Sequence, residues 1–508
     1  MSGHPYCRRL SEEDFLSIKE MTMAGIPPRQ ILTSLRQKNP KFQAIARTVY
    51  NARAKINKDG LAGRTPIQAL LDELGQEEFA YDVEYDGNGH LTHLFFAHPK
   101  SVLLMRSYSN VFVMDCTYKT NRYKMPLLEI VGISSFNSSF QSCFAFLRSE
   151  EEADYVWALI RFERILGSSQ HPSVIATDRK FALLGAIGHV FPKTTHLLCV
   201  WHIQKNILAN CKKHFETKID FDGFLSAWAD LVRSSNELVF DEAWRNLEIL
   251  YKDKPIVVNY LKGTWLPLKE KFVDAWTEDK LHFGTRVSSR AEGAHLMIKK
   301  YLQVSTGDLR QVKQKICNGI VNQYKEITAK FESEKLRIPH KFHIPLFKNL
   351  LGHVSVFALE EIYKQHEMAM SSILPPCKGQ FSETMGLPCA HRIQDMKSAG
   401  FGLENIHTQW RFDVRSFSGI CENLKDDGDN IDNLLKQFQL KYNKMSLIEK
   451  EDSRKQVCQL VEHSYPLIKE PLTCSHRGRP LSAKRKRESS STTRDPSAFE
   501  IIEKGRKG

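Results

Sequence analysis

The segment VFVMDCTYKTNRYKMPLLEIVG, residues 111–132, constrains the fold of this 508-residue chain more than any other. An apolar run ends at Asp115, a polar turn follows, and a second apolar run begins near Pro126. A carboxylate at the end of a buried strand is costly to desolvate unless a metal ion or a charged partner compensates it. The run SVIATDRKF, residues 173–181, repeats this design and carries Asp178. Two strand-end aspartates are what a nuclease-like magnesium site needs.

The order of apolar patterns around these aspartates predicts an α/β fold with a mixed sheet. Three strand-like runs come close together, and a helix, a strand, a helix and a further strand then alternate. The predicted strands are 111–117, 126–135, 142–148, 173–178 and 195–202, and the helices between the later ones are 151–166 and 179–190. Residues 203–280 have apolar residues at helical spacing and no strand-like run, so we expect them to be wholly helical.

The N-terminal part is predicted to be helical, with a hairpin before the sheet. Three short helices are expected at 11–25, 27–39 and 42–56, a further helix at 66–75, and a hairpin at 81–99 with Asp-Gly-Asn-Gly at its turn. The third helix carries Arg47, Arg53 and Lys55, which suits a helix-turn-helix that places its last helix on DNA. A plain helical bundle explains the apolar spacing equally well.

The positive charge of the chain is concentrated at its two ends. The whole sequence has 72 basic and 59 acidic residues, a net charge of +13. Residues 1–60 hold 11 basic and 5 acidic residues, and residues 475–508 hold 10 and 4, so the long middle is almost neutral. Basic termini around a neutral core favour a polyanionic partner, most simply nucleic acid, over tails that merely maintain solubility.

Cysteine usage and hydropathy indicate an intracellular, reducing and soluble setting. The 11 cysteines have no disulfide-like rhythm, no signal peptide opens the chain, and no apolar run reaches the roughly 18–20 residues of a membrane span. The abrupt start at a Cys-bearing stretch, around Cys7, is compatible with the loss of part of an upstream DNA-binding module.

A nuclease-like site needs a third acidic residue, and the two aspartates alone are not specific. Asp178 could simply cap the helix that begins at Arg179. The best third candidate is Glu292, in RVSSRAEGAHLMIKKYL, which reads as a helix with Glu292 at the flank of its apolar stripe. The alternative for Glu292 is a solvated helix glutamate.

Four strings occur in an order that resembles the transposases of Mutator-like elements. They are DCTYKTNRYKMPLL, TDRKFALLGAI, CVWHIQKNI and RVSSRAEGAHLMIKKYL, and the resemblance covers roughly residues 80–310. It implies a ribonuclease H-like catalytic core with an Asp-Asp-Glu triad and a helical insertion before the final Glu. Matched motif by motif, the triad would be Asp115, Asp178 and Glu292.

The resemblance also implies the chemistry. Three carboxylates can hold two Mg²⁺ (or Mn²⁺) ions that promote in-line attack on a phosphodiester, first to cut the element end and then to join it to target DNA. Cys199 and His202 form a C-x-x-H pair whose spacing permits zinc ligation, but two ligands do not make a structural zinc site. In the family this pair lies near the active site, where His202 could approach the scissile phosphate. A packed strand-end cysteine with a capping histidine is the alternative.

The segment CKGQFSETMGLPCAHRI resembles the SWIM-type zinc finger that follows the catalytic core in this family. The family pattern is Cys-x-Cys, a spacer and Cys-x-His, but position 379 is Gly and position 375 is Pro, so three candidate ligands stand here: Cys377, Cys389 and His391. A tetrahedral Zn²⁺ site would be one ligand short. Either a remote residue such as Cys421 completes it, or the module folds without metal.

The tail CSHRGRPLSAKRKRESSSTTRDPS is predicted to be disordered. Arg477 and Arg479, in Arg-Gly-Arg-Pro, resemble the core of an AT-hook, which places two arginines in a narrow minor groove. The run Lys484–Arg487 suits a nuclear import signal, so we expect a nuclear protein. A merely solvated charge run is the alternative.

Together these features predict five regions and an enzyme. The regions are a helix-turn-helix-like DNA-binding region at 1–60, a helix and hairpin at 61–107, a ribonuclease H-like catalytic domain at 108–335 with a helical insertion at about 216–280, a helical region at 336–470 with the SWIM-like segment at 372–395, and a basic tail at 475–508. The expected function is that of a DDE-type DNA transposase. Its expected partners are double-stranded DNA and, by analogy, further copies of the chain. The alternative is a domesticated, non-catalytic DNA-binding transcription regulator derived from such a transposase. A nuclease that acts on RNA has no support from an RNA-reading motif.

Overall fold

The structure is a computed structural model of the 508-residue chain. It describes residues 9–40, 42–167, 171–285, 293, 301–302, 307–370, 374, 376–396, 400–413, 438–443, 445, 450, 453–454 and 468–473. The tail after 473, and with it Arg477 and Arg479, lies outside the described residues, as do Glu292 and Cys421.

A seven-stranded mixed sheet forms the centre of the described chain, as the alternation of patterns predicts. Its strands are β1 (Ala80–Tyr85), β2 (Leu91–Ala97), β3 (Val111–Thr117), β4 (Leu127–Ile133), β5 (Ser139–Phe146), β6 (Val174–Thr177) and β7 (Thr195–Leu198). Their order across the sheet is β1-β2-β5-β4-β3-β6-β7. The pairs from β1 to β3 are antiparallel, and β6 runs parallel to both β3 and β7.

Helices account for most of the remaining described chain. Before and within the sheet they are α1 (Glu12–Met23), α2 (Pro28–Lys38), α3 (Ala46–Leu61), α4 (Pro66–Gln76), α5 (Pro99–Ser107), α6 (Glu152–Leu166) and α7 (Phe181–Val190). After β7 come α8 (Val200–Cys211), α9 (Lys218–Val232), α10 (Glu237–Leu250), α11 (Pro255–Thr264), α12 (Asp274–Thr277), α14 (Leu309–Leu336), α15 (Val356–Met370), α16 (Gln380–Met385) and α17 (Ala390–Asp395). Short 3-10 turns are η2 (Lys212–His214), η3 (Leu266–Lys271), η5 (His340–Phe342), η6 (Pro345–Phe347), η7 (Leu403–Asn405) and η8 (Thr408–Trp410).

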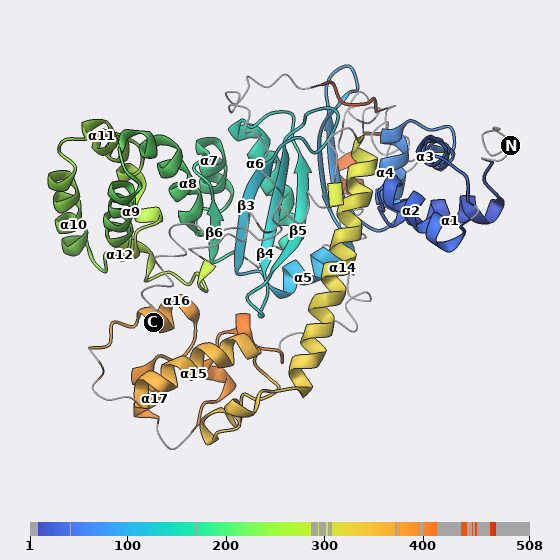
Figure 1. The fold of residues 1–508 in the computed structure, drawn as a ribbon. Coiled ribbons are helices and arrows are strands. Elements are labelled where there is room, and N and C mark those ends of the chain that lie inside the picture. Colours follow the sequence, from blue (N-terminus) through green and yellow to red (C-terminus); the bar gives the residue numbers. More distant parts are fainter. Residues whose placement is uncertain are drawn as a thin grey trace.

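Three helical groups surround the sheet (Figure 1). The helices α8–α12 stand to one side of it, where the sequence predicts an all-helical stretch, and α1–α4 stand to the other side. Helices α15–α17 lie beyond one end of the sheet, and α14 extends toward them from beside α4. None of the helices in the described part of the chain combines the length and apolarity that a membrane span requires.

The sheet is covered on both faces, which explains why its central strands are continuously apolar rather than alternating. On one face Phe112, Met114 and Ile130 pack against α5, α6, α7 and part of α14. On the other face two separate apolar clusters form. One joins Val113 and Val131 to the region 342–410, and the other joins Leu127 and Phe144 to α4 and the first half of α14.

Two predicted elements differ from the structure. The last strand ends at Leu198 rather than 202, because the ladder with β6 stops at the Thr177–Leu198 pair and Cys199 turns the chain into α8. The sequence predicts a helical region at 336–470, but within it residues 403–405 and 408–410 form the 3-10 turns η7 and η8. There Trp410 is fully buried and donates to the carbonyl of Met385 at 2.6 Å, so packing of the indole fixes the chain locally. Most of 414–467 lies outside the described residues.

Candidate functional site

The register of the sheet brings Asp115 and Asp178 together. Met114 lies opposite Thr177 on the parallel strand β6, so the next residues, Asp115 and Asp178, follow side by side. Because side chains alternate along a strand, Asp115 shares its face with Val113, and Asp178 shares the same face with Ala176. Asp178 therefore follows the end of β6 next to Asp115. It does not cap α7, whose N-cap residue is Lys180 and which has no side-chain cap hydrogen bond.

A further carboxylate, Glu129, lies on the same face and was not predicted from the sequence. Glu129 pairs directly with Asp115 across the antiparallel β3–β4 ladder and has no solvent exposure. Directly opposed residues of an antiparallel pair point to the same side. The signal that could have found it is an acidic residue in the middle of the apolar run of β4.

The electrostatics of this edge oppose the accumulation of negative charge. Burial raises the pKa of Asp178, and the carboxylate of Glu150 raises it further, whereas the charge and the backbone N–H of Lys180 lower it. A cation bound between the aspartates would remove this penalty, since it favours the ionised carboxylates. Carboxylate oxygens are also the ligands that Mg²⁺ and Mn²⁺ prefer, so the type of donor fits a hard divalent cation. Among the described residues, however, no three of these side chains bring their ligand atoms within 4.8 Å of one another, so a complete cation site needs a further ligand.

The structure places His202 beside Asp115. Its Nε2 is 3.5 Å from Oδ2 of Asp115, and the two side chains are 21% and 14% exposed. Burial, with a smaller effect from Lys205, lowers the pKa of His202 to about 4. The imidazole is therefore neutral at pH 7, and its contact with Asp115 is polar rather than an ion pair.

Cys199 is the first residue of the turn into α8 and does not belong to a zinc site in the described chain. It is buried, and burial raises the pKa of its thiol to about 11, which disfavours the thiolate that Zn²⁺ requires. Among the described residues, only Cys377, Cys389 and His391 bring three potential metal-ligand atoms within 4.8 Å of one another, and this group does not include Cys199. Cys199 is therefore a buried core residue, and His202 is a histidine that contacts Asp115.

The third predicted triad residue, Glu292, lies outside the described residues. Phe283 and Leu302 are the described core residues that come closest to Glu292 in the sequence, one before it and one after it. Phe283 packs in the cluster of Val113 and Val131, and Leu302 packs in the cluster of Leu127 and Phe144. Both clusters cover the face that carries Asp115 and Glu129. The two anchors of the segment therefore lie on the face where a third acidic ligand is needed.

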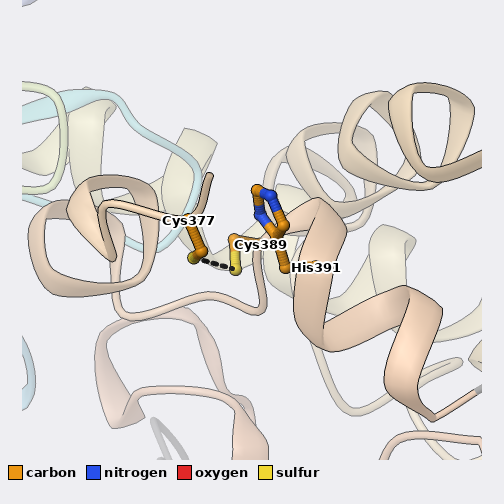
Figure 2. Close-up of side chains that lie close together, drawn as sticks. All are labelled: Cys377, Cys389 and His391. Carbon is orange, nitrogen blue, oxygen red and sulfur yellow. Dashed lines mark hydrogen bonds between the residues drawn. The ribbon is translucent and has the colours of Figure 1, made fainter. Parts of the chain in front are cut away.

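A second group of potential ligands forms at the predicted SWIM-like segment (Figure 2). Cys377 lies before α16, Cys389 caps α17, and His391 is in the first turn of α17. One ligand atom from each lies within 4.8 Å of the others, and the two sulfur atoms are 3.9 Å apart without a disulfide. The fold therefore brings the ligand atoms of these three residues close together.

The environment of Cys389 favours its thiolate. Burial alone would raise the pKa of the thiol, but the backbone N–H of Arg392 and hydrogen bonds with Ser382, Cys377 and His391 outweigh it and lower the pKa to about 7. Two thiols and an imidazole at this spacing fit Zn²⁺, which prefers sulfur and nitrogen ligands. Gly379, where the family has a cysteine, begins α16 with a φ of 73°, a backbone conformation that glycine adopts without strain.

The predicted DNA-binding residues of α3 differ in exposure. Arg47 and Lys55 are exposed, and the ammonium of Lys55 lies 5.5 Å from the centre of the Phe15 ring. Arg53 is half-buried, and its charge adds to burial in lowering the pKa of Lys315 on α14. Of the three predicted residues, Arg47 and Lys55 therefore present accessible charge, as does the exposed Lys58 near the end of the helix, while Arg53 faces the junction with α14.

Comparison with known proteins supports a relationship to transposases. Residues 111–206 match the family model of the MULE transposase domain. The PKS-NRPS hybrid synthetase cheA of Chaetomium globosum is 26% identical over 478 residues, which cover 84% of this chain and 10% of that protein. In Arabidopsis thaliana, protein FAR1-related sequence 5 is 24% identical over 306 residues, covering 59% of this chain and 38% of that protein. Protein FAR-RED IMPAIRED RESPONSE 1 of the same plant is 24% identical over 233 residues, covering 44% and 26%.

This chain spans between a tenth and about two fifths of the length of these three relatives, so the names of the whole proteins do not carry over to it. The matched segment runs from the start of β3 to the middle of α8, and it includes Asp115, Asp178 and His202. The resemblance that the sequence motifs indicate is confirmed over residues 111–206, which match the family model of the MULE transposase domain.

Proposed function

We propose that the chain is a DNA transposase of the Mutator-like class that cuts and joins phosphodiesters with a divalent metal. The observation that carries the proposal is the placement of Asp115 and Asp178 side by side on one face of the sheet, inside the MULE domain. The proposal includes a ribonuclease H-like core, which the mixed sheet with β6 parallel to β3 and β7 supports.

In this proposal Asp115, Asp178 and Glu292 hold two Mg²⁺ or Mn²⁺ ions, which when bound activate the attacking hydroxyl and stabilise the leaving oxygen. The residues of the chain have separate tasks. The two aspartates are positioned by adjacent strands, so their separation is set by the sheet rather than by loops. Neutral His202 beside Asp115 can donate or accept one hydrogen bond at the scissile phosphate.

We further propose that Cys377, Cys389 and His391 bind Zn²⁺ with a fourth ligand, as a structural centre of the region that contains α15–α17. The convergence of two sulfur atoms and one imidazole, and the lowered pKa of the Cys389 thiol, support this assignment. A nuclear location, double-stranded DNA as partner and self-association belong to the same proposal, and the basic ends of the chain support the DNA partner.

A second candidate function is a DNA-binding regulator that descends from a transposase and has lost catalysis. It is favoured by the relative whose name refers to an impaired far-red response rather than to transposition. Both functions require DNA binding, and only the first requires metal-dependent cleavage.

Incubation of the full chain with a labelled duplex from the flanks of its own gene, with Mg²⁺ or with EDTA, separates the two functions. Transposase activity predicts Mg²⁺-dependent nicks at a defined position and joined products with target DNA. Binding without cleavage at any metal concentration would exclude the first function and leave the regulator.

A further inference from the structure

A half-buried acidic residue outside the predicted triad, Glu150, contacts three hydrogen-bond donors close to the aspartates. Its Oε1 accepts hydrogen bonds from the hydroxyls of Tyr118 at 2.6 Å and Tyr155 at 3.2 Å. Its Oε2 lies 2.9 Å from the ammonium of Lys180. The side chain of Glu150 is only 15% exposed, so these contacts replace nearly all of its hydration.

Two of these donors belong to the chain segments that leave the two aspartates. Tyr118 is three residues after Asp115, and Lys180 is two residues after Asp178. The carboxylate of Glu150 therefore joins the segment after β3 to the segment after β6. Tyr155 adds a third connection, since its hydroxyl also lies 3.3 Å from the sulfur of Cys116, the residue after Asp115.

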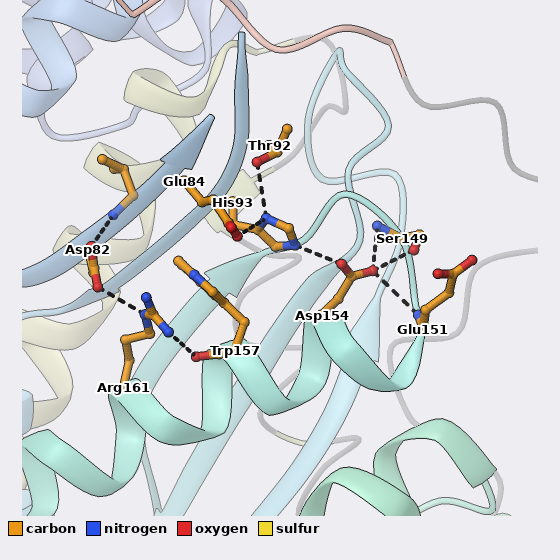
Figure 3. Close-up of polar contacts among 10 residues, drawn as sticks. Asp82, Glu84, Thr92, His93, Ser149, Glu151, Asp154, Trp157 and Arg161 are labelled. Atoms are coloured by element: carbon orange, nitrogen blue, oxygen red, sulfur yellow. Dashed lines mark hydrogen bonds and ion pairs between the residues drawn. The ribbon is translucent and has the colours of Figure 1, made fainter. Parts of the chain in front are cut away.

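The loop that carries Glu150 is itself held on both sides (Figure 3). Oδ2 of Asp154 accepts hydrogen bonds from the backbone N–H groups of Ser149, at 3.1 Å, and Glu151, at 3.4 Å. Oδ1 of Asp154 contacts Nε2 of His93 on β2 at 2.8 Å. The residues before and after Glu150 are thus attached to α6 and, through His93, to the sheet, so the carboxylate has a fixed position.

We propose that Glu150 is a positioning residue of the acidic site, which sets the relative positions of Asp115 and Asp178 for cation binding by holding Tyr118 and Lys180. The inference rests on the proposed function, because it assigns Glu150 a task in the same metal site.

Glu150 acts through the aspartates and does not ligate the cation. A carboxylate oxygen has two lone-pair directions, and both on Oε1 are taken by the two tyrosine hydroxyls. Oε2 is paired with Lys180, so the Glu150–Lys180 pair is neutral as a unit. A ligand of Mg²⁺ would have to give up these partners, whereas a positioning residue keeps them.

Binding of Mn²⁺ to the full chain, followed by the electron paramagnetic resonance signal of the free ion, tests this role. We expect Glu150→Gln and Lys180→Met each to raise the Mn²⁺ dissociation constant by about tenfold without a change in the number of sites, as is typical of residues that orient metal ligands. The double variant is expected to bind about as weakly as either single variant, because both changes remove the same contact. The control removes a more exposed ion pair far from the site, Lys341–Glu360, by Lys341→Met and Glu360→Gln, and is expected to bind Mn²⁺ like the wild type.

The outcomes separate this inference from the proposed function. Wild-type affinity in both Glu150→Gln and Lys180→Met would overturn the positioning role. Loss of sites in Glu150→Gln alone, as expected for Asp115→Asn, would make Glu150 a ligand and overturn it as well. If Asp115→Asn and Asp178→Asn bind Mn²⁺ like the wild type, the proposed metal site itself fails. Lys180→Met keeps the test valid if Glu150→Gln does not fold.

Discussion

Two candidate metal sites of the molecule are built in opposite ways. One is the acidic edge of the sheet, which consists of Asp115, Asp178 and Glu129, and the other is the Cys/His centre, which consists of Cys377, Cys389 and His391. The acidic edge offers oxygen ligands from strands that lie 63 positions apart in the chain, Asp115 and Asp178, which the sheet register brings together. The Cys/His centre offers sulfur and nitrogen ligands from one short segment, in which Cys389 caps α17 and His391 follows it.

The two sites therefore differ in how much their metal affinity depends on the whole fold. The acidic edge exists only when the sheet is formed, so its affinity should respond to residues that adjust strand ends, such as Glu150. The Cys/His centre depends on local chain geometry, so its metal would instead contribute to the stability of its own region. Hard oxygen ligands select Mg²⁺ or Mn²⁺, and sulfur ligands select Zn²⁺, so the two sites should not exchange metals.

The largest expected effect concerns the acidic edge. Asp115→Asn or Asp178→Asn should lower Mg²⁺-dependent DNA cleavage by roughly a thousandfold, about 4 kcal/mol of barrier, because each removes one charged ligand. Strand cleavage under single-turnover conditions measures this. The control is Asp86→Asn, a carboxylate in the β1–β2 turn, which should cleave normally. Activity of either aspartate variant at the wild-type rate would remove that residue from the site.

At the Cys/His centre we expect a change in the amount of bound zinc rather than in a reaction rate. Cys389→Ser should reduce the zinc content from about one ion per chain to none, since the remaining ligands are too few for a closed tetrahedral site. Atomic absorption of the purified protein measures it, with Cys317→Ser on α14 as the control. Equal zinc content in Cys389→Ser and the wild type would show that this cluster is not the zinc site.

DNA binding through α3 should not depend on the acidic edge or on the Cys/His centre. Arg47→Ala and Lys55→Ala should each weaken binding several-fold and reduce the salt slope of log K by about one, as loss of one phosphate contact does. Fluorescence anisotropy between low and high salt measures the slope. The exposed Lys19 on α1 provides the control variant Lys19→Ala. An unchanged slope for Arg47→Ala and Lys55→Ala would place the DNA contact elsewhere.

A further expected effect concerns the stability of the loop beside the acidic edge. Asp154→Asn should lower the free energy of unfolding by about 2 kcal/mol at pH 7, because charge-assisted hydrogen bonds are weakened. Burial opposes ionisation of Asp154, but hydrogen bonds from His93 and Ser149 outweigh it and lower its pKa. The stabilisation is therefore fully present above the ordinary pKa of Asp, about 3.9, and is lost as the pH falls through the lower folded value.

Urea denaturation at neutral and acidic pH measures this difference, with Asp241→Asn on the exposed face of α10 as the control. A difference between wild type and Asp154→Asn that persists undiminished at the lowest pH would contradict the assigned role of the ionised carboxylate. The zinc content of the Cys/His centre should not change in this variant.

The sequence predicts the elements that depend on local pattern. Strands β3, β4 and β6 follow from apolar runs between polar turns, and the helices after β7 follow from apolar spacing without interruption. The positions of Asp115 and Asp178 follow from the rule that parallel strands end at the same edge. The sequence predicts a strand through Cys199, whereas the structure starts α8 there, because the apolar residues of THLLCVWH suit a strand and a helix equally well.

The sequence could not predict that Glu129 and Glu150 belong to the acidic site, because their positions there depend on tertiary contacts. Glu150 belongs to the acidic run Glu150–Glu152, which is typical of the first turn of a helix and carries no sign of its bonds to Tyr118 and Lys180. Glu129 becomes part of the acidic edge only through the β3–β4 register. The role of Glu292 stays a prediction, since it lies outside the described residues.

Anomalous scattering from crystals of the full chain grown with Mn²⁺ and a DNA end tests the central claim most directly. We expect a Mn²⁺ peak within ligand distance, about 2.1–2.3 Å, of carboxylate oxygens from both Asp115 and Asp178. A Mn²⁺ peak elsewhere, with these two side chains free of metal in the DNA-bound chain, would contradict it.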